Sequence, residues 1–566
     1  MKSLKKMLVL ASASGLIALA QQSRAAVLTW DIDSSDGATI TPGSGTWDLA
    51  TPNWNDGATN IVWPNISGTN GADATFAGAD GTYAIDVASS LNVNNLKFNN
   101  SGYTLSASAP HTITLAGQLN IASGKTATVG NNVTINRGAA YNVQGGGTLN
   151  IDSGGIVTGS GNPLAILTST TVLPGGTLKT TGSTSIAISV NAPLTVSGGT
   201  VAPAGLLVIA NASNTTGTIT LDSGAVNLDP GAGLRVAGGS TNAITNTTAT
   251  FNLNGGTLTT PKIYTGLGTG ANGTFNFNGG TLKANATTSI FMTGLATANV
   301  RAGGAIIDTQ ANTINIAQAL LHDAVLGATP DGGLQKLGAG TLSLTGANTY
   351  TGATTVSSGS LFFDGTHTGA GAYTVSASAG SGATLGGSGR IGLGSALVNV
   401  AVSSSSPLAA DNGILAPGAF AGNVGTLTVD GGTGVVLGDN STFLVDYAGS
   451  TSDHLFITGG GNLDLTSVSN TLSLVGSGTG TYTIAQFAGY NGPAALNQFE
   501  TVLLNGQVAQ GIDPSLPNYA AVTYNPDNIS VTIAVPEPGS LALLGLGALA
   551  IGNRRRRRNR TAARVR

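Results

Sequence analysis

The residues that could carry out chemistry are few and lie far apart in the sequence. No two of the four histidines have the His-x3-His spacing of a metal site. Asp453 and His454 are adjacent, but neighbours on a strand point to opposite faces of the sheet. We therefore expect a solvated turn here rather than an acid–base pair. The histidines are His111, His322, His367 and His454.

The basic residues within the chain are equally scattered. Apart from those at the two ends, they stand singly, from Lys97 to Arg390. A lyase or hydrolase on a β-helix would need several Asp, Lys or Arg side chains in one groove, and glycoside hydrolysis needs two carboxyl groups that meet. The chain has no Cys for a thiolate metal site. The sequence thus predicts no catalytic residue, no cofactor and no metal site.

The composition predicts many short strands. The chain of 566 residues has 85 Gly and, apart from Ala and Leu, few good helix formers. Thr and Val, punctuated by Gly, Asn and Asp, are typical of strands joined by tight turns. With the basic ends set aside, the acids exceed the bases by about 15, which argues against nucleic-acid binding.

Related segments recur about every two dozen residues through the middle of the chain. The segment 249–260 (ATFNLNGGTLTT) matches 273–284 (GTFNFNGGTLKA), and relatives of the GGTL core occur from Gly146 to Gly303. Such a period is typical of one coil of a solenoid, whose coils must stack to bury their apolar faces. The sequence predicts an all-β fold, a right-handed parallel β-helix. An antiparallel sandwich array is the alternative.

Within one copy of the repeat, the residues alternate with a period of two. Phe251 and Leu253 are expected to face one side of a strand, and Asn252 and Asn254 the other. The Gly pair that follows supplies the positive φ of a tight corner. Asn254 and Asn278 then fall at equivalent corners, where we expect their side chains to hydrogen-bond along the stack.

One segment of the repeat region, 312–328, has a helical spacing. Its apolar residues include Ile316, Leu320, Leu321 and Ala324. A short helix and an irregular coil are therefore alternatives. We favour strand because both flanks are strand-like.

The next segment, 334–361, carries a recognisable motif. It reads LQKLGAGTLSLTGANTYTGATTVSSGSL and resembles the autotransporter-associated β-strand repeat. The resemblance implies a parallel β-helix of the kind found in secreted bacterial surface proteins. The motif residues are Gly338, Gly340, Thr341, Leu342, Asn348, Tyr350 and Gly352.

All four tryptophans lie near the start of the mature chain. A repeat stack has exposed ends that must be covered, so a cluster of large aromatic residues in the first coil is best interpreted as a cap. The alternative is an aromatic platform that binds sugar. The residues are Trp30, Trp47, Trp54 and Trp63.

The N-terminus has the three parts of a secretory signal. Lysines precede an apolar run over residues 7–20, which is too short to span a membrane. Small residues then precede a predicted cut between Ala25 and Ala26. We expect export with removal of residues 1–25, and an uncleaved anchor is the alternative.

A block of positive charge follows an apolar stretch at the other end. As a short helix, residues 540–552 would span about 20 Å, less than the roughly 30 Å of a bilayer core. The basic residues would stay on the cytoplasmic side, and their long stems would reduce the mismatch. We expect a transient anchor at the inner membrane. The basic cluster is Arg554, Arg555, Arg556, Arg557 and Arg558.

The whole C-terminal segment is similar to the PEP-CTERM sorting signal, which has a short motif, an apolar stretch and a basic cluster in this order. The motif here is Val535, Pro536, Glu537 and Pro538, whose prolines cannot continue a helix. The resemblance implies recognition and cleavage by an exosortase, with the motif as substrate. It also implies a surface or matrix protein of Gram-negative bacteria that make exopolysaccharide.

The sequence thus predicts four parts: a signal peptide (1–25), β-helix repeats with a Trp-rich cap (26–365), a second β-rich region (366–534) and a sorting signal (535–566). We expect an exported surface or extracellular-matrix protein with a structural or adhesive role in biofilm. Its expected partners are an exosortase, exopolysaccharide and, transiently, the inner membrane. The alternative is a matrix polysaccharide lyase or hydrolase on a β-helix scaffold. A third reading, an autotransporter passenger, fits less well because the chain ends in arginines rather than membrane strands.

Overall fold

The structure, a computed structural model, describes residues 26–534 except 36, 38, 161–162, 183–185, 242, 378–381, 403–412, 419–422, 468, 488, 491–497 and 510–518. The chain divides into two compact units, Met1–Leu228 and Asp229–Arg566. The one helix among the described residues is a 3-10 turn, η2 (Ala324–Leu326). None of these residues belongs to a helix long and apolar enough to cross a membrane. The predicted apolar helix at 540–552 lies outside them.

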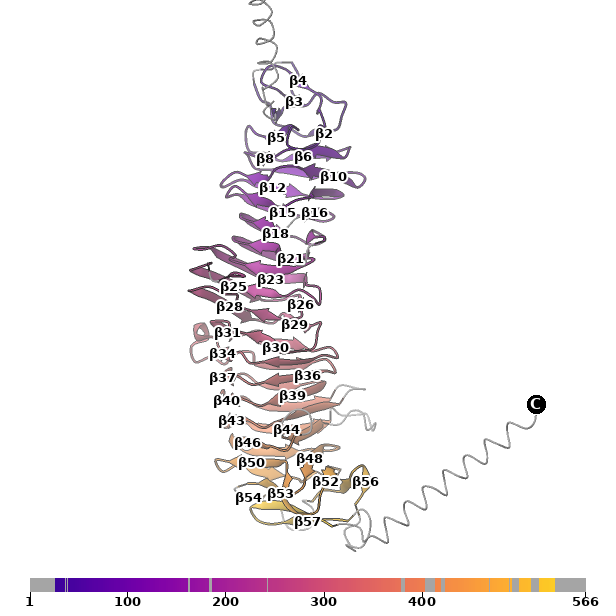
Figure 1. The fold of residues 1–566 in the computed structure, drawn as a ribbon, viewed down its shortest axis with the longest axis vertical. Helices are drawn as coiled ribbons and strands as arrows, with labels where there is room; N and C mark the ends of the chain where they lie inside the picture. Colours follow the sequence, from indigo (N-terminus) through magenta and orange to yellow (C-terminus); the bar gives the residue numbers. More distant parts are fainter. Residues whose placement is uncertain are drawn as a thin grey trace, which may run out of the picture. The chain divides into compact units, whose positions relative to one another are not determined.

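In the first unit, parallel strands stack coil upon coil in two sheets (Figure 1). One stack contains β5 (Asp73–Phe76), β8 (Leu96–Phe98), β11 (Leu119–Ile121), β14 (Tyr141–Gln144) and β17 (Leu164–Ile166). Another contains β9 (Tyr103–Ser106), β12 (Thr126–Val129), β15 (Thr148–Ile151), β18 (Ser169–Val172) and β21 (Pro193–Ala202). Within β15, Leu149 and Ile151 are buried while Thr148 and Asn150 face outward, as the period of two requires.

The second unit has the same parallel stacking, with strands in three sheets. Two stacks belong to one sheet. The first contains β25 (Thr247–Leu253), β28 (Ala271–Phe277), β31 (Thr297–Val300) and β34 (Leu320–His322). The second contains β26 (Thr257–Thr260), β29 (Thr281–Ala284), β32 (Ala305–Asp308), β35 (Leu334–Leu337), β38 (Thr354–Val356) and β41 (Tyr373–Ala377). A second sheet contains β33 (Thr313–Ile316), β36 (Thr341–Leu344), β39 (Gly359–Phe363) and β42 (Ala383–Gly387). The third contains β37 (Ala347–Asn348), β40 (Thr366–His367), β43 (Arg390–Gly394), β46 (Thr426–Gly431), β50 (His454–Thr458) and β53 (Gly480–Gln486).

The sequence repeat corresponds to one coil of this stack. Phe251 pairs with Phe275 in register, and the two rings stack with centroids 5.2 Å apart. Asn278 donates from Nδ2 to Oδ1 of Asn254 (3.1 Å), so the predicted asparagine contact is confirmed. Gly279 has a φ of 99°, as the corner requires. Parallel pairing in register is consistent with a β-helix and contradicts the antiparallel alternative.

The segment 312–328 forms strands, as favoured from its flanks. β33 and β34 lie within it, and only η2 is helical. Its apolar residues Ile316 and Leu320 are buried because each ends or begins a strand that faces the core. The helical spacing therefore arose from two short strands with a break between them.

Antiparallel pairing occurs at the first and last described strands of the chain. β1 (Val27–Trp30) pairs antiparallel with β3 (Trp54–Asn55), which pairs with β4 (Asn60–Ile61). β58 (Asn528–Ile533) pairs antiparallel with β53 and with β57 (Ala520–Tyr524). The predicted boundary near residue 365 lies within the second unit and stays a prediction.

Candidate functional site

The predicted processing sites lie at or beyond the limits of the described residues. Ala26 is the first described residue and is exposed just before β1, whereas Ala25 lies outside. The motif 535–538 and the arginines 554–558 also lie outside. The last described strand before the motif, β58, pairs with a strand on each side. The motif therefore follows an interior strand of its sheet.

Residues of the repeat motif and of the flanking segments form a group of polar side chains in the second unit, which we call the polar corner. All of them are buried except His322, which is half-buried. Its members, from three successive coils, are His322, Asp331, Lys336, Asn348, Tyr350 and His367. Burial of polar groups is costly unless they are hydrogen-bonded. The partners of each member therefore show what the corner does.

Asn348 joins three coils at the end of β37, where it is fully buried. Its Oδ1 accepts a hydrogen bond from the backbone N–H of Leu320 in the preceding coil (2.9 Å). Its Nδ2 donates to the carbonyl oxygens of Gly346 (3.1 Å) and, in the following coil, Thr366 (3.3 Å). An amide provides both the acceptor and the donors, which explains why asparagine occupies this motif position.

The motif glycines Gly340 and Gly352 lie where neighbouring coils approach closely. A Cβ atom on Gly340 would lie 2.0 Å from the carbonyl oxygen of Asn312. One on Gly352 would lie 2.3 Å from the carbonyl oxygen of Asp331. In β36, Leu342 points into the core and Thr341 is half-buried. These motif residues support stacking of the coils.

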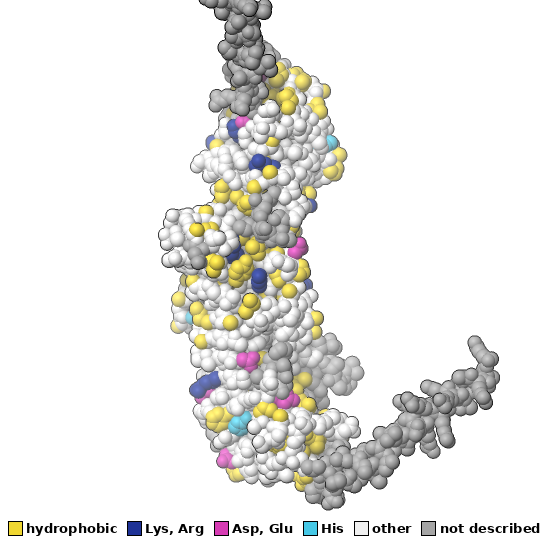
Figure 2. All heavy atoms as spheres, in the orientation of Figure 1, with side chains coloured by type: hydrophobic (Ala, Val, Ile, Leu, Met, Phe, Trp, Pro, Cys, Tyr) yellow, Lys and Arg dark blue, Asp and Glu magenta, His cyan; other side chains and the backbone are white. Residues whose placement is uncertain are grey.

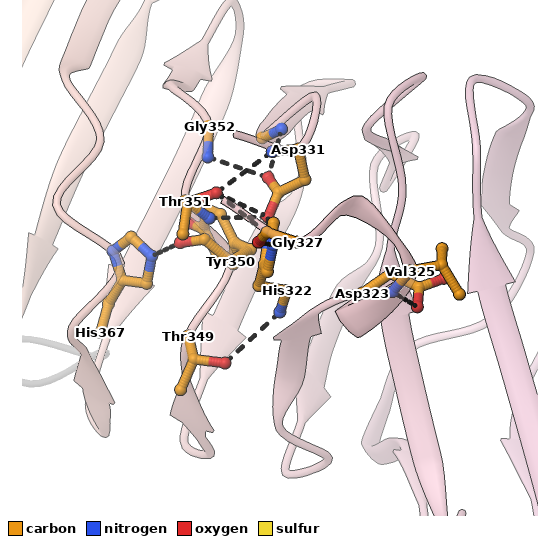
Figure 3. A network of polar contacts seen from close by, with 11 residues as sticks. His322, Asp323, Val325, Gly327, Asp331, Thr349, Tyr350, Thr351, Gly352 and His367 are labelled. Carbon is orange, nitrogen blue, oxygen red and sulfur yellow. Dashed lines mark hydrogen bonds and ion pairs between the residues drawn. The ribbon is translucent and has the colours of Figure 1, made fainter. Parts of the chain in front are cut away.

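Asp331 is held by a dense set of donors (Figure 3). Its Oδ1 accepts from the backbone N–H groups of Gly333 (2.9 Å) and Gly352 (2.8 Å). Its Oδ2 accepts from the backbone N–H and hydroxyl of Thr351 (2.7 and 3.1 Å) and faces His322 Nδ1 at 2.9 Å. Burial raises the pKa of Asp331, but these donors outweigh it, so the pKa lies below its usual value of 3.8.

His322, Asp331 and Thr351 have the composition of a catalytic triad but not its geometry. In a triad, histidine uses one nitrogen for the acid and the other for the hydroxyl. Here the carboxylate and the Thr351 hydroxyl both face Nδ1, at 2.9 and 3.1 Å. The other nitrogen, Nε2, is 3.0 Å from the carbonyl oxygen of Gly327. Neither nitrogen is therefore free to take a proton from a nucleophile.

His367 and Tyr350 stack in the core with ring centroids 4.0 Å apart. Burial lowers the pKa of His367, so the ring is neutral. Its Nε2 donates to the carbonyl oxygen of Tyr350 (2.7 Å), and its Nδ1 accepts from the hydroxyl of Tyr373. The Tyr350 hydroxyl contacts Thr354 Oγ1 (2.7 Å). Both rings thus connect coils.

Lys336 is a buried lysine that the sequence did not single out. It lies on β35 and is fully buried. Its Nζ donates to the carbonyl oxygens of Leu337 (2.9 Å), Gly338 (2.7 Å) and Ser358 (3.0 Å), which uses all three donors. Burial lowers the pKa of Lys336 to about 7. The alternation along the strand places an apolar residue at this position, and the lysine found there is the sequence signal that could have predicted its burial.

Asp453 and His454 do not form the predicted solvated turn, so that expectation is wrong. Asp453 is buried, and its carboxylate accepts from the backbone N–H groups of Gly425 and Asp446, both at 2.9 Å. Burial raises the pKa of Asp453 to about 7, although the two N–H groups oppose the shift. Gly425, which lies 28 residues before Asp453 (β49, Thr451–Ser452, directly precedes this residue), is brought to the carboxylate by the fold, which local sequence does not reveal. The two side chains make no hydrogen bond with each other among the described residues.

The tryptophans form a closed cluster in the first unit, which we call the aromatic cap. Trp30, Trp47, Trp54, Trp63 and Phe76 are all buried, and the Trp54 and Trp63 rings lie 4.7 Å apart. The indole N–H groups of Trp30 and Trp63 donate to backbone carbonyl oxygens. The rings face one another and the core, which favours a cap over a platform that binds sugar, and the cap stays a prediction.

Charged groups are sparse on the described surface. Figure 2 shows them as small separate patches on the visible face. Several bases pair with single acids, as in Lys97–Asp73 (2.7 Å) and Arg301–Asp323 (2.7 Å). Among the described residues, no three His, Asp or Glu side chains are grouped so that they could hold a metal ion.

Two family models match the chain. The passenger-associated-transport-repeat matches residues 334–361, and the PEP-CTERM protein-sorting motif matches residues 534–558. Both predicted resemblances are therefore confirmed. The sorting motif indicates an exported protein that is anchored at the membrane before an exosortase processes it. A search of curated proteins finds no match.

Proposed function

We propose that this protein is a right-handed parallel β-helix with a structural or adhesive role at the cell surface or in the extracellular matrix. Its signal peptide directs export, and an exosortase then cuts near 535–538. Right-handed connection between parallel strands is the general preference of such folds. The mature chain acts by presenting a polar, sparsely charged surface to exopolysaccharide in a biofilm.

The sorting-motif match carries this proposal. It begins at Ala534, the residue that follows β58. An interior strand thus immediately precedes the segment that the exosortase would recognise. The polar corner supports a structural role because its side chains bind backbone groups of neighbouring coils.

The enzyme alternative has one supporting observation, the raised pKa of Asp453. A carboxyl group with a pKa of about 7 could serve as a general acid. We do not favour it because Asp453 is buried and both its oxygens accept backbone N–H groups. We propose instead that Asp453 stabilises the loops beside β50, and that the protein has no catalytic residue.

Mass spectrometry of the native C-terminus tests the sorting step. In cells with the exosortase, we expect the mature chain to end near 535–538. In cells without it, we expect peptides that extend to Arg566. Glu537→Gln should reduce processing, whereas the control Glu500→Gln, which changes the only other glutamate, should not. Retention of Arg566 in both strains would contradict the proposal.

Binding of the purified mature chain to the producing cells' exopolysaccharide tests the proposed role. We expect sedimentation with the polysaccharide and no change in its chain length. Depolymerisation that Asp453→Asn abolishes would instead support the enzyme alternative.

A further inference from the structure

We propose that His322 makes the loop 323–333 a pH-sensitive latch, closed at low pH while its ring is protonated and open at high pH once the ring has lost that proton. The loop joins β34 to β35 and contains η2. This inference goes beyond the proposed function and does not depend on exosortase processing. It concerns which segment of the exported chain first becomes accessible, for example to a protease, when the loop opens.

Two contacts from one ring hold the loop. His322 Nδ1 lies 2.9 Å from Asp331 Oδ2, near the end of the loop. His322 Nε2 lies 3.0 Å from the carbonyl oxygen of Gly327, in its middle. Both partners are acceptors, and a neutral imidazole has only one N–H. Both contacts can be hydrogen bonds only when the ring is protonated.

The charges around the ring favour that protonated form. Asp331 faces it directly, and Asp323 adds a second negative charge that Arg301 partly offsets at 2.7 Å. On the next coil, burial keeps Tyr350 protonated and His367 neutral, so these two add no charge. The net electrostatic potential at the His322 ring is therefore negative.

The direction of the pH effect follows from this potential. The hydrogen bond to Asp331 raises the pKa of His322 above its usual value of 6.5, although burial opposes the shift. The stability from the latch is thus fully present below pH 6.5 and is lost as the pH rises through the folded-state pKa. Hydrogen bonds from Thr351, Gly333 and Gly352 to Asp331 remain after deprotonation.

Loss of the proton should therefore release the middle of the loop first. A neutral ring keeps its N–H on Nδ1, because a lone pair there would face the Asp331 carboxylate at 2.9 Å. It then has no donor for Gly327. This part of the loop has little other burial: Val325 in η2 is 76% exposed. Its other contacts include the Arg301–Asp323 ion pair and the Asp323 cap on Val325 N–H (3.2 Å). Short-range backbone hydrogen bonds also remain, among them Leu326 N–H to Asp323 (3.0 Å) and Thr329 N–H to Leu326 (3.1 Å).

Hydrogen exchange of the purified full chain tests the latch. Exchange rates are corrected for intrinsic pH dependence and compared with peptides from β25 and β28. We expect protection of 323–333 to fall about tenfold between pH 6 and pH 9, because a hydrogen bond to a charged group is lost. Nitrogen NMR of the His322 ring should show both nitrogens protonated at pH 6 and a midpoint that coincides with loop opening.

Two variants separate the latch from general loosening. His322→Gln cannot titrate, so loop protection should no longer depend on pH. Thr351→Val removes a hydroxyl from Asp331 but keeps His322, so it should lower protection while the pH dependence remains. Wild-type protection that is unchanged between pH 6 and pH 9 would overturn the proposal, as would a neutral His322 ring at pH 6. The ring measurement decides even if a variant does not fold.

Discussion

The aromatic cap of the first unit and the polar corner of the second fill their cores in opposite ways. In the cap, Trp54 contacts three other indole rings and Phe76, at centroid distances from 4.7 to 5.5 Å. In the corner, Asn348, Asp331 and Lys336 bind named backbone groups. The cap relies on apolar area and the corner on directional hydrogen bonds.

The difference has a physical consequence for how each region tolerates change. Apolar burial is non-directional and roughly proportional to area, so a smaller side chain removes part of it. A hydrogen-bonded group that loses its partner leaves a buried donor or acceptor unsatisfied, which costs more than the bond contributed. The cap should therefore respond to lost volume, and the corner to lost polar atoms and to pH.

The largest expected effect is in the cap. Trp54→Ala should lower the free energy of unfolding by about 3–5 kcal/mol, because it leaves a cavity among the other rings. Leu49→Ala is the control, since Leu49 is 45% exposed, and it should cost less than about 0.5 kcal/mol. Denaturant unfolding followed by tryptophan fluorescence reports on this region, since all four tryptophans lie there. Equal effects of the two variants would show that the cap does not act as a core.

A somewhat smaller effect is expected at the polar corner. Asn348→Ala removes little volume but leaves Leu320 N–H and two carbonyl oxygens without their partner, which should cost about 2–3 kcal/mol. The matched change Asn315→Ala removes hydrogen bonds at the exposed surface and should cost about 0–1 kcal/mol. Hydrogen exchange of β36 and β39 measures the loss of stability in both variants. An Asn348 variant as stable as the Asn315 variant would refute the proposed role of directional bonds.

The smallest expected effect is a dependence of stability on pH around Asp453, the buried acid of the same unit. The pKa of Asp453 is raised to about 7, so the folded state holds its proton more tightly than the unfolded state. Its contribution is present below pH 3.8 and is lost as the pH rises through 7. Protection of β48 (Thr442–Ala448) and β50 should therefore fall between pH 6 and pH 8 by about 1–2 kcal/mol.

Asp453→Asn should flatten this dependence, because the amide does not titrate. Asp464→Asn is the control, since Asp464 accepts a bond from Thr466 N–H at the exposed surface. If the Asp453 variant keeps the wild-type pH dependence, the buried carboxyl group is not the cause of that dependence.

Much of the fold could be predicted because short-range sequence patterns encode the repeat. The alternation from Phe251 to Asn254 and the glycines after it set strand, corner and coil length. The segment 312–328 was harder, because two short strands with a gap imitate a helical spacing. Its strands are set by pairing with neighbouring coils, which that segment alone does not encode.

The polar corner could be predicted only in part. The motif residues Asn348 and Tyr350 stood out, whereas His322, Asp331 and Lys336 did not. Asp331 and Thr351 are 20 residues apart and meet because coil stacking places them side by side. Asp453 was misjudged for the same reason: local rules leave a residue beside a turn exposed, yet Asp453 is buried and binds the N–H of Gly425, 28 residues away.

The sequence by itself determined the sorting motif, the export signal expected at the N-terminus and the period of the coils, since each is a property of a continuous segment. Only the tertiary structure decided which polar side chains became buried and which proton-binding groups met. Hydrogen bonds between coils join residues that the repeat period separates. The chemistry of such a site therefore depends on register, which forms only when the coils stack.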